Sequence, residues 1–274
     1  MKGFVYKDMM LPIQKLKPEI AKNLLGVFFD IDGTFTSFGK ILPGAYQSLW
    51  RLKNSGLKVV PITGRPAGWC DHIARMWPVD GIVGENGALY FWFDSKGHTL
   101  KKRFIDPEKI RCENRKRLSR IRDEILSSVS GVAVASDQRY RETDLAIDYC
   151  EDVNPVDQKS IDLICDIFKK NNAQFKISSI HINGWFGNYN KLKMTKIFAQ
   201  ELWGIDLDAS KNCFVFCGDS PNDEPMFRYF PYTAGVKNIL KFVSQMKHIP
   251  TFMASKEGGD GFVEIVNTIL QHRA

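Results

Sequence analysis

The sequence has no apolar run that approaches the ~20 residues needed to cross a bilayer. Residues 1–20 are interrupted by Lys7, Asp8 and Lys15 and therefore lack the apolar core of a signal peptide. The six cysteines are scattered, without a CxxC pair or the dense spacing of a disulfide framework, and we interpret them as reduced thiols. These absences lead us to expect a cytoplasmic protein.

The 274 residues carry a net charge of +7, which suggests an anionic partner without identifying it. The excess of positive charge is concentrated between residues 96 and 122, where there are 11 Lys or Arg and three Asp or Glu. Leu118, Ile121 and Ile125 recur there at helical spacing, which favours a helix with a solvated basic face. Attraction of a phosphorylated substrate is one alternative. Nucleic-acid binding is another, but no stacking motif or recognition-helix signature supports it.

Strand and helix patterns alternate at both ends of the chain, and the apolar strand patterns are continuous, as in parallel strands buried on both faces. The predicted strands are 24–31, 57–63, 81–83, 213–218 and 232–236. The predicted helices are 43–56, 66–76, 191–203 and 224–229, with a further helix after residue 236. This order predicts an α/β fold with a doubly wound parallel sheet.

Residues 88–185 break the alternation. Five strand patterns occur there, two of which suit a hairpin across residues 94–97. They are accompanied by long helix patterns at 107–129 and 155–170, the second with Asn154 as its N-cap. We therefore expect an α+β cap domain at 88–185, inserted into a core domain that consists of residues 1–87 and 186–274.

Two aspartates follow the first predicted strand. Doubly wound sheets bind ligands at the carboxyl ends of their strands, so a site is expected there. Asp30 and Asp32 are two residues apart, which places both side chains on one side of an extended chain. Gly33 allows a sharp turn, so that its amide and that of Thr34 can face an anion. Because an Asp-Gly pair is also common in ordinary turns, the chemical interpretation needs support from other strand ends.

The next strand supplies a hydroxyl at its end. Thr63, Gly64 and Arg65 follow it directly, with Pro66 at the first position of the helix. The hydroxyl could bond a phosphate oxygen with help from the helix N-terminus, or it could simply cap the helix.

The strand at 213–218 is followed by Asp219, Asn222 and Asp223. Their oxygen atoms suit Mg²⁺, which prefers one or two carboxylates together with water and substrate phosphate. An Asx-rich turn would use the same residues. Carboxylate, hydroxyl and carboxylate groups at three strand ends nevertheless favour a phosphate- and metal-binding site.

These motifs, in this order, resemble those of the haloacid dehalogenase (HAD) superfamily of phosphatases. The matching segments are DIDGT at 30–34, TGR at 63–65, GENGA at 84–88, GDSPND at 218–223 and a lysine at the start of a helix. The position of the insertion, between the threonine and lysine motifs, resembles the Cof-type subclass with a class IIB α/β cap. The resemblance covers essentially the whole chain and implies a Rossmann-like core with an inserted cap.

The resemblance also implies roles for single residues. Asp30 would attack phosphorus and form an aspartyl-phosphate, while Asp32 would protonate the leaving oxygen and then activate water. Thr63, Gly64 and a lysine would hold the phosphoryl group.

Further roles concern the metal and the cap. Mg²⁺ would be bound by the Asp30 carboxylate, the Asp32 carbonyl and Asp219, with Asn222 and Asp223 supporting that loop. Arg65 and Asn86 are candidates for contacts with the substrate or the cap.

The identity of the lysine depends on the register of the helix at 191–203. In the family pattern, Asp or Asn precedes this lysine and glycine usually follows it. Asn190 before Lys191 fits best, although Leu192 replaces the glycine; Lys193 is the runner-up.

Three residues of the insertion have a structural interpretation beside a functional one. We expect His181 to be a hydrogen-bonded structural residue rather than a substrate ligand. Arg139 and Arg141 could reach the cleft or could lie in solvated loops.

Together these features predict a Mg²⁺-dependent phosphatase that acts on a small phosphorylated metabolite, with a sugar phosphate as the favoured class. A phosphomutase of the same superfamily is the first alternative, in which Asp30 would pass the phosphoryl group to a sugar instead of water. A non-catalytic protein that binds phosphosugars or nucleic acid is the second. We expect no membrane partner, and the sequence does not identify the oligomeric state.

Overall fold

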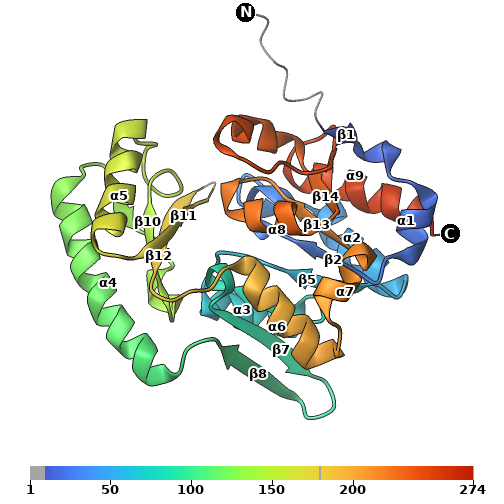
Figure 1. Ribbon diagram of the computed structural model, residues 1–274, viewed down its shortest axis with the longest axis horizontal. Helices are drawn as coiled ribbons and strands as arrows, with labels where there is room; N and C mark the ends of the chain where they lie inside the picture. The colour runs from blue at the N-terminus through green and yellow to red at the C-terminus, as the bar shows by residue number, and fades with distance from the viewer. Residues whose placement is uncertain (1–9, 179, 274) are drawn as a thin grey trace, which may run out of the picture.

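The computed structural model describes residues 10–178 and 180–273. Its centre is a six-stranded parallel sheet in the order β1-β15-β14-β13-β2-β5 (Figure 1). These strands are β1 (Leu11–Pro12), β15 (Phe252–Met253), β14 (Tyr232–Gly235), β13 (Phe214–Gly218), β2 (Gly26–Phe29) and β5 (Lys58–Pro61). Every neighbouring pair runs parallel, which confirms the predicted doubly wound sheet.

Helices cover both faces of this sheet, which explains why its strands are continuously apolar. Val27 and Phe29 of β2 point into the apolar cluster beneath one face, and Phe28 points into the cluster beneath the other. The first face is covered by α1 (Pro18–Asn23), α2 (Pro43–Asn54) and α9 (Gly258–Gln271). The second is covered by α6 (Lys191–Trp203), α7 (Leu207–Ser210) and α8 (Glu224–Tyr229).

A second, three-stranded sheet extends the core beyond β5. It consists of β6 (Ile82–Gly84), β7 (Leu89–Asp94) and β8 (Thr99–Phe104), and an isolated parallel bridge between Ile62 and Val83 joins it to the main sheet. β7 and β8 form the hairpin predicted across residues 94–97, with Asp94 paired to Thr99. One face of β7 packs against α3 (Ala67–Met76) and the other against α6.

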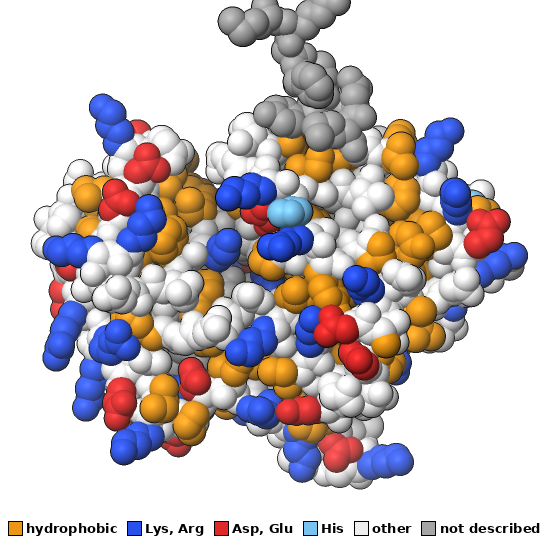
Figure 2. All heavy atoms as spheres, in the orientation of Figure 1, with side chains coloured by type: hydrophobic (Ala, Val, Ile, Leu, Met, Phe, Trp, Pro, Cys, Tyr) orange, Lys and Arg blue, Asp and Glu red, His pale blue; other side chains and the backbone are white. Residues whose placement is uncertain are grey.

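The remaining sheet forms a separate layer, at the left of Figure 1. Its antiparallel order is β11 (Gln174–Ile177), β12 (His181–Trp185), β10 (Asp144–Asp148) and β9 (Ala133–Val134). The helices α4 (Glu108–Ser128) and α5 (Gln158–Lys170) pack on it and share its own apolar cluster. Lys and Arg side chains lie along the outer surface over α4 (Figure 2), as expected for a solvated basic face.

The predicted domain boundaries remain a prediction. Because β7 and β8 pack on core helices, we propose that the cap begins after the hairpin, at about residue 107, and ends near Trp185. The first core segment would then extend to about residue 106.

Three local expectations differ from the structure. α5 begins at Gln158 and its N-cap is Asp157, not Asn154, because the Val156 amide is already bonded to the Tyr149 carbonyl. The strand β11 was not expected before residue 178. The small hairpin of β3 (Thr36–Ser37) and β4 (Lys40–Ile41) was not expected either, because its strands are too short to show an alternation of polar and apolar residues. No helix in the two described ranges is long and apolar enough to span a membrane.

Gly184 lies where the cap sheet meets α5, and this contact generates a stability prediction. A Cβ at Gly184 would collide with the ring of Phe168, a fully buried side chain. We expect Gly184→Ala to lower the free energy of unfolding by about 1–3 kcal/mol, as overpacking does. Gly44→Ala in α2 is the matched control, since a Cβ there meets only Val263, at 3.5 Å. Its stability should be unchanged or up to about 1 kcal/mol higher. Urea unfolding would compare them, and equal midpoints would contradict the prediction.

Candidate active site

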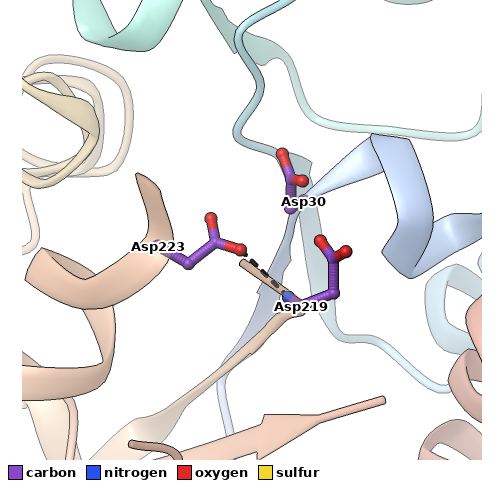
Figure 3. A group of neighbouring side chains, drawn as sticks. All are labelled: Asp30, Asp219 and Asp223. Atoms are coloured by element: carbon purple, nitrogen blue, oxygen red, sulfur yellow. Dashed lines mark hydrogen bonds between the residues drawn. The ribbon is translucent and has the colours of Figure 1, made fainter. Parts of the chain in front are cut away.

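The carboxyl ends of β2 and β13 bring two aspartates together. Phe29 is paired with Cys217, so Asp30 and Asp219 emerge side by side from neighbouring strands. The Asp30 amide donates to the Cys217 carbonyl at 2.9 Å and continues the ladder. Asp223, in the turn after β13, completes a trio whose carboxylate oxygens lie within 4.8 Å of one another. Figure 3 shows the three carboxylates converging on one space.

Lys191 places a cation beside this trio. It is the first residue of α6, and Asn190 caps that helix by accepting from the Lys193 amide at 2.9 Å. The Lys191 ammonium contacts Asp30 at 2.8 Å and Asp223 at 2.7 Å, and the side chain is 1% exposed. Lys193, in contrast, is exposed and donates to the Asn188 carbonyl at 2.7 Å. Of the two lysines considered from sequence, Lys191 is thus the one beside Asp30.

The buried charged groups shift one another's pKa values. Burial raises the pKa of Asp30 to about 7 despite the nearby Lys191, and repulsion from Asp223 and Asp32 acts in the same direction. Burial, with repulsion from Asp30 and Asp223, also raises the pKa of Asp219 well above its usual value. For Lys191, burial opposes the charged form, but Asp223 and Asp30 outweigh it and raise the pKa.

The trio could hold a metal ion. One lysine faces three buried carboxylates, so the cluster carries excess negative charge that an added cation would neutralise. The donors are all hard oxygen atoms, which is the set that Mg²⁺ and Ca²⁺ select. The residues present therefore fit a divalent cation.

The oxygen atoms of Asp219 are held in place by neighbours. Thr34 donates to one oxygen at 3.2 Å, and Asn238 donates to the other at 2.9 Å. Asn238 also donates to the Gly33 carbonyl at 2.8 Å and so links the two strand ends. Gly33 has a φ of +76°, and a Cβ there would collide with Asp219. The close approach therefore requires glycine at this position.

The Asp223 carboxylate stabilises the loop in which it lies. One oxygen accepts from the amides of Asp219 at 3.0 Å and Ser220 at 3.4 Å, while the other contacts Lys191. Ser220 and Asp223 form a reciprocal capping box, and Asn222 accepts from the Ser220 hydroxyl at 2.9 Å. Asp223 thus bonds two amides of its own loop as well as Lys191, whereas the Asp30 carboxylate bonds only Lys191 among the residues that the structure describes.

Asp32 points away from this cluster toward Arg65. Its two oxygens accept from the Arg65 guanidinium at 2.8 and 2.9 Å. Arg65 reaches the cap as well, because the same guanidinium contacts Glu151 at 2.7 Å and Asp137 at 3.4 Å. His181 lies 2.8 Å from Glu151 and also lines the small space over Asp30, so its structural role stays a prediction.

Thr63 and Gly64 lie between Asp32 and the cap. The Thr63 side chain is fully buried and its oxygen accepts from the Arg65 amide at 3.0 Å. The Gly64 carbonyl accepts from Arg141 of the cap at 2.8 Å. Arg141 is therefore buried at the junction, where it also pairs with Asp137 and Asp144, whereas Arg139 is exposed.

Glu85 and Asn86 form another link between core and cap. The Glu85 carboxylate accepts from the Glu142 amide at 2.8 Å and from the Thr143 amide at 2.7 Å. Asn86 donates to Asp144 at 3.4 Å. The space enclosed between the core and cap residues is about 10 Å³, roughly enough for one water molecule. The structure therefore shows the cap closed over Asp30.

Sequence reasoning did not identify Asn238, Glu85, Asp137 and Glu151 as members of this site. One feature of the sequence weakly indicated that Asn238 belongs to the site: it follows a predicted strand that ends at the same edge of the sheet. Glu85 lies in the GENGA segment, where only Asn86 was singled out, and Asp137 and Glu151 are single acidic residues without a motif of their own.

Residues 27–114 match the family model of haloacid dehalogenase-like hydrolases. A search of curated proteins finds no match. A Thermoplasma acidophilum protein of solved structure is 19% identical, with 90% of this chain and 98% of that chain covered and a TM-score of 0.68. The sucrose-phosphatase of Synechocystis, solved with sucrose and phosphate, is 15% identical, with 89% and 97% covered and a TM-score of 0.62.

A sugar phosphatase of HAD subclass IIB is also similar. It is 15% identical, with 88% of this chain and 97% of that chain covered and a TM-score of 0.59. The expected fold, a parallel-sheet core with an inserted α+β cap, is thus shared with these solved structures. Residues 27–114 are thus similar to the haloacid dehalogenase-like hydrolases, and the chain as a whole shares the fold of these solved structures.

Proposed function

We propose that the protein is a Mg²⁺-dependent phosphatase that hydrolyses a small phosphorylated metabolite through an aspartyl-phosphate. The observation that carries this proposal is the buried cluster of Asp30, Asp219 and Lys191 at the ends of two paired strands. The match of residues 27–114 to a family model of haloacid dehalogenase-like hydrolases supports the reaction class.

In the first half-reaction, a carboxylate oxygen of Asp30 forms a bond to phosphorus while the bond from phosphorus to the leaving oxygen breaks. Asp32 donates a proton to that oxygen, so the product leaves as an alcohol. In the second, water attacks the phosphorus of the aspartyl-phosphate, Asp32 accepts its proton, and inorganic phosphate leaves as Asp30 is regenerated.

Lys191 and Thr63 would stabilise the phosphoryl oxygens. The Lys191 ammonium already lies against Asp30, so it would meet a phosphoryl group bound to that carboxylate. Thr63 accepts a bond from the Arg65 amide, which leaves its hydroxyl hydrogen available to a phosphoryl oxygen. The Gly64 amide lies at the same turn.

Asp30 and Asp219 would hold Mg²⁺, together with the Asp32 carbonyl, while Asp223 and Asn222 keep the loop in place. When bound, the ion would neutralise charge on the phosphoryl group during transfer. The contacts of Asp223 with two amides and Lys191 support its assignment to the loop rather than to the ion.

The cap would open and close in each cycle. The closed cavity has no room for a phosphate ester, so the contacts of Arg65 with Glu151 and of Arg141 with the Gly64 carbonyl must part before substrate enters. Closure then excludes water from the transferring phosphoryl group.

Sugar phosphates are the first class to test as substrates, because similar structures include a sucrose-phosphatase and a sugar phosphatase. A screen of phosphorylated metabolites for phosphate release tests the proposal. A phosphomutase would instead need a bisphosphate activator and would release no inorganic phosphate.

Asp30→Asn keeps the shape of the side chain but removes the nucleophilic charge. We expect turnover to fall by roughly three orders of magnitude or more, as when other enzymes lose a nucleophile. The fold should persist, since Lys191 retains its 2.7 Å contact with Asp223. Phosphate release and thermal unfolding would be measured together. Near-normal turnover in a folded Asp30→Asn protein would rule out the covalent route.

A divalent cation should stabilise the protein because it relieves repulsion within the acidic trio. We expect Mg²⁺ to raise Tm in the parent but not in Asp219→Asn, and a chelator to abolish phosphate release. The Tm shift should be larger at pH 8 than at pH 6, because a proton on Asp30, whose pKa is raised to about 7, competes with the cation.

A surface substitution controls for unspecific effects of charge. Asp123→Asn removes a carboxylate that is 64% exposed and whose ion-pair partner among the described residues is Arg122. This variant should respond to Mg²⁺ like the parent. Full activity in excess chelator would refute the metal requirement.

Lys191→Met and Lys193→Met form a matched pair two residues apart on α6. Lys191→Met leaves three buried carboxylates without their lysine, so we expect a loss of about 3–5 kcal/mol in the free energy of unfolding and loss of phosphate release. Lys193 is exposed, so Lys193→Met should remain close to the parent in both measurements. The opposite ranking would show that Lys193 is the phosphate contact.

A further inference from the structure

A second cavity lies directly beside Asp32, between α3, the β3–β4 hairpin and the cap. Its volume is about 490 Å³, within the range of roughly 300–1,000 Å³ that is typical of small-molecule sites. The aromatic side chains Trp69, Trp77 and Tyr140 line it, together with the isoleucines Ile31, Ile41 and Ile73. A cavity of this size and composition can enclose a small apolar molecule.

This cavity is continuous with the catalytic machinery through two side chains. Asp32 and Arg65 line both it and the small space over Asp30. The space over Asp30 has room for roughly one water molecule. If Asp32 protonates the leaving oxygen, the rest of the leaving group must begin at Asp32. The large cavity is the neighbouring volume that can accommodate it.

The lining offers few free hydrogen-bonding groups. Apart from the aromatic residues, its polar side chains are Asp32, Thr36, Arg65 and His72. Asp32 and Arg65 are paired with each other, and the Thr36 hydroxyl donates to the Ile31 carbonyl at 3.2 Å. A sugar rich in hydroxyl groups would lose bonds to water here without replacing them. A flat aromatic ring would lose none.

The walls also suit a ring specifically. The Arg65 guanidinium stacks on Trp69, 4.3 Å from the ring centroid, and fixes the orientation of that indole. Tyr140 reaches the cavity from the cap and packs on Gly68, where a Cβ would lie 2.9 Å from the Tyr140 Cβ. Closing the cap therefore brings the third aromatic wall onto α3.

We propose that this cavity is the leaving-group site and that it selects phosphate monoesters of aromatic alcohols. The inference rests on the proposed phosphatase function and narrows its substrate class, from phosphorylated metabolites in general to those with an aromatic ring next to the ester. Trp69 and Tyr140 are the specificity-determining residues.

The test compares benzyl phosphate with glucose 6-phosphate, both of which are esters of primary alcohols. The parent should show a kcat/KM at least about tenfold higher for benzyl phosphate. Trp69→Ala and Tyr140→Ala should each lower that kcat/KM, mainly through KM, and reduce the preference for benzyl phosphate over glucose 6-phosphate. Tyr140→Ala spares the stack on Arg65. Trp50→Ala, which removes a half-exposed tryptophan of α2 outside the cavity, is the control and should match the parent.

Binding of benzyl alcohol separates this inference from the proposed function. The parent should bind it, and Trp69→Ala should bind it more weakly, whether or not the protein turns over any ester. A parent that hydrolyses neither ester but binds benzyl alcohol in this way would refute the phosphatase and support the cavity. Equal or better use of glucose 6-phosphate, or no loss of binding in Trp69→Ala, would overturn the aromatic site and leave the phosphatase standing.

Discussion

Three carboxylates and one ammonium group share a space at the end of the central sheet that water hardly reaches. Charges are held there only because each has a partner: Lys191 lies between Asp30 and Asp223, and Thr34 and Asn238 donate to Asp219. The arrangement explains why the strands β2 and β13 must be so apolar. Two helix layers bury both faces of the sheet and so provide low-dielectric surroundings. In such surroundings a single lysine interacts strongly with a carboxylate beside it.

The cap is joined to this core mainly by ion pairs and hydrogen bonds rather than by a shared apolar core. Its own apolar cluster is separate, and the junction is formed by Arg65 with Glu151, Glu85 with the Thr143 amide, and Arg141 with the Gly64 carbonyl. Interfaces of this kind part more readily than packed apolar layers, because water can replace the lost bonds. The chemistry of the junction thus suits a lid that must release product.

Much of the fold followed from sequence because local signals and tertiary structure agree. The continuous apolar runs that precede Asp30 and Asp219 predicted buried parallel strands, and Asn190 indicated the start of α6 and hence the register of Lys191. The roles assigned to these residues remain predictions.

The junction with the cap could not be derived in the same way. Arg65 and Glu151 are 86 residues apart, and nothing in either segment encodes the other. The strand β11 was missed because its alternation of polar and apolar residues extends over only the four residues Gln174–Ile177, all exposed or half-buried. Likewise, the sequence around Arg141 does not indicate whether its side chain faces solvent or a buried aspartate. That depends on the tertiary structure.

The pairing of Phe29 with Cys217 has a consequence for how the site can fail. Neighbouring strands are held about 4.8 Å apart by their hydrogen bonds, and this spacing sets the separation of the residues that follow them. β2 and β13 have neighbours on both sides in the sheet, so they belong to the part of the chain that opens last. Detachment of the cap or fraying of the short β1 would leave the spacing of Asp30 and Asp219 intact. Cation affinity should therefore report on the pairing of β2 with β13 and not on the state of the cap or of the edge strand β1.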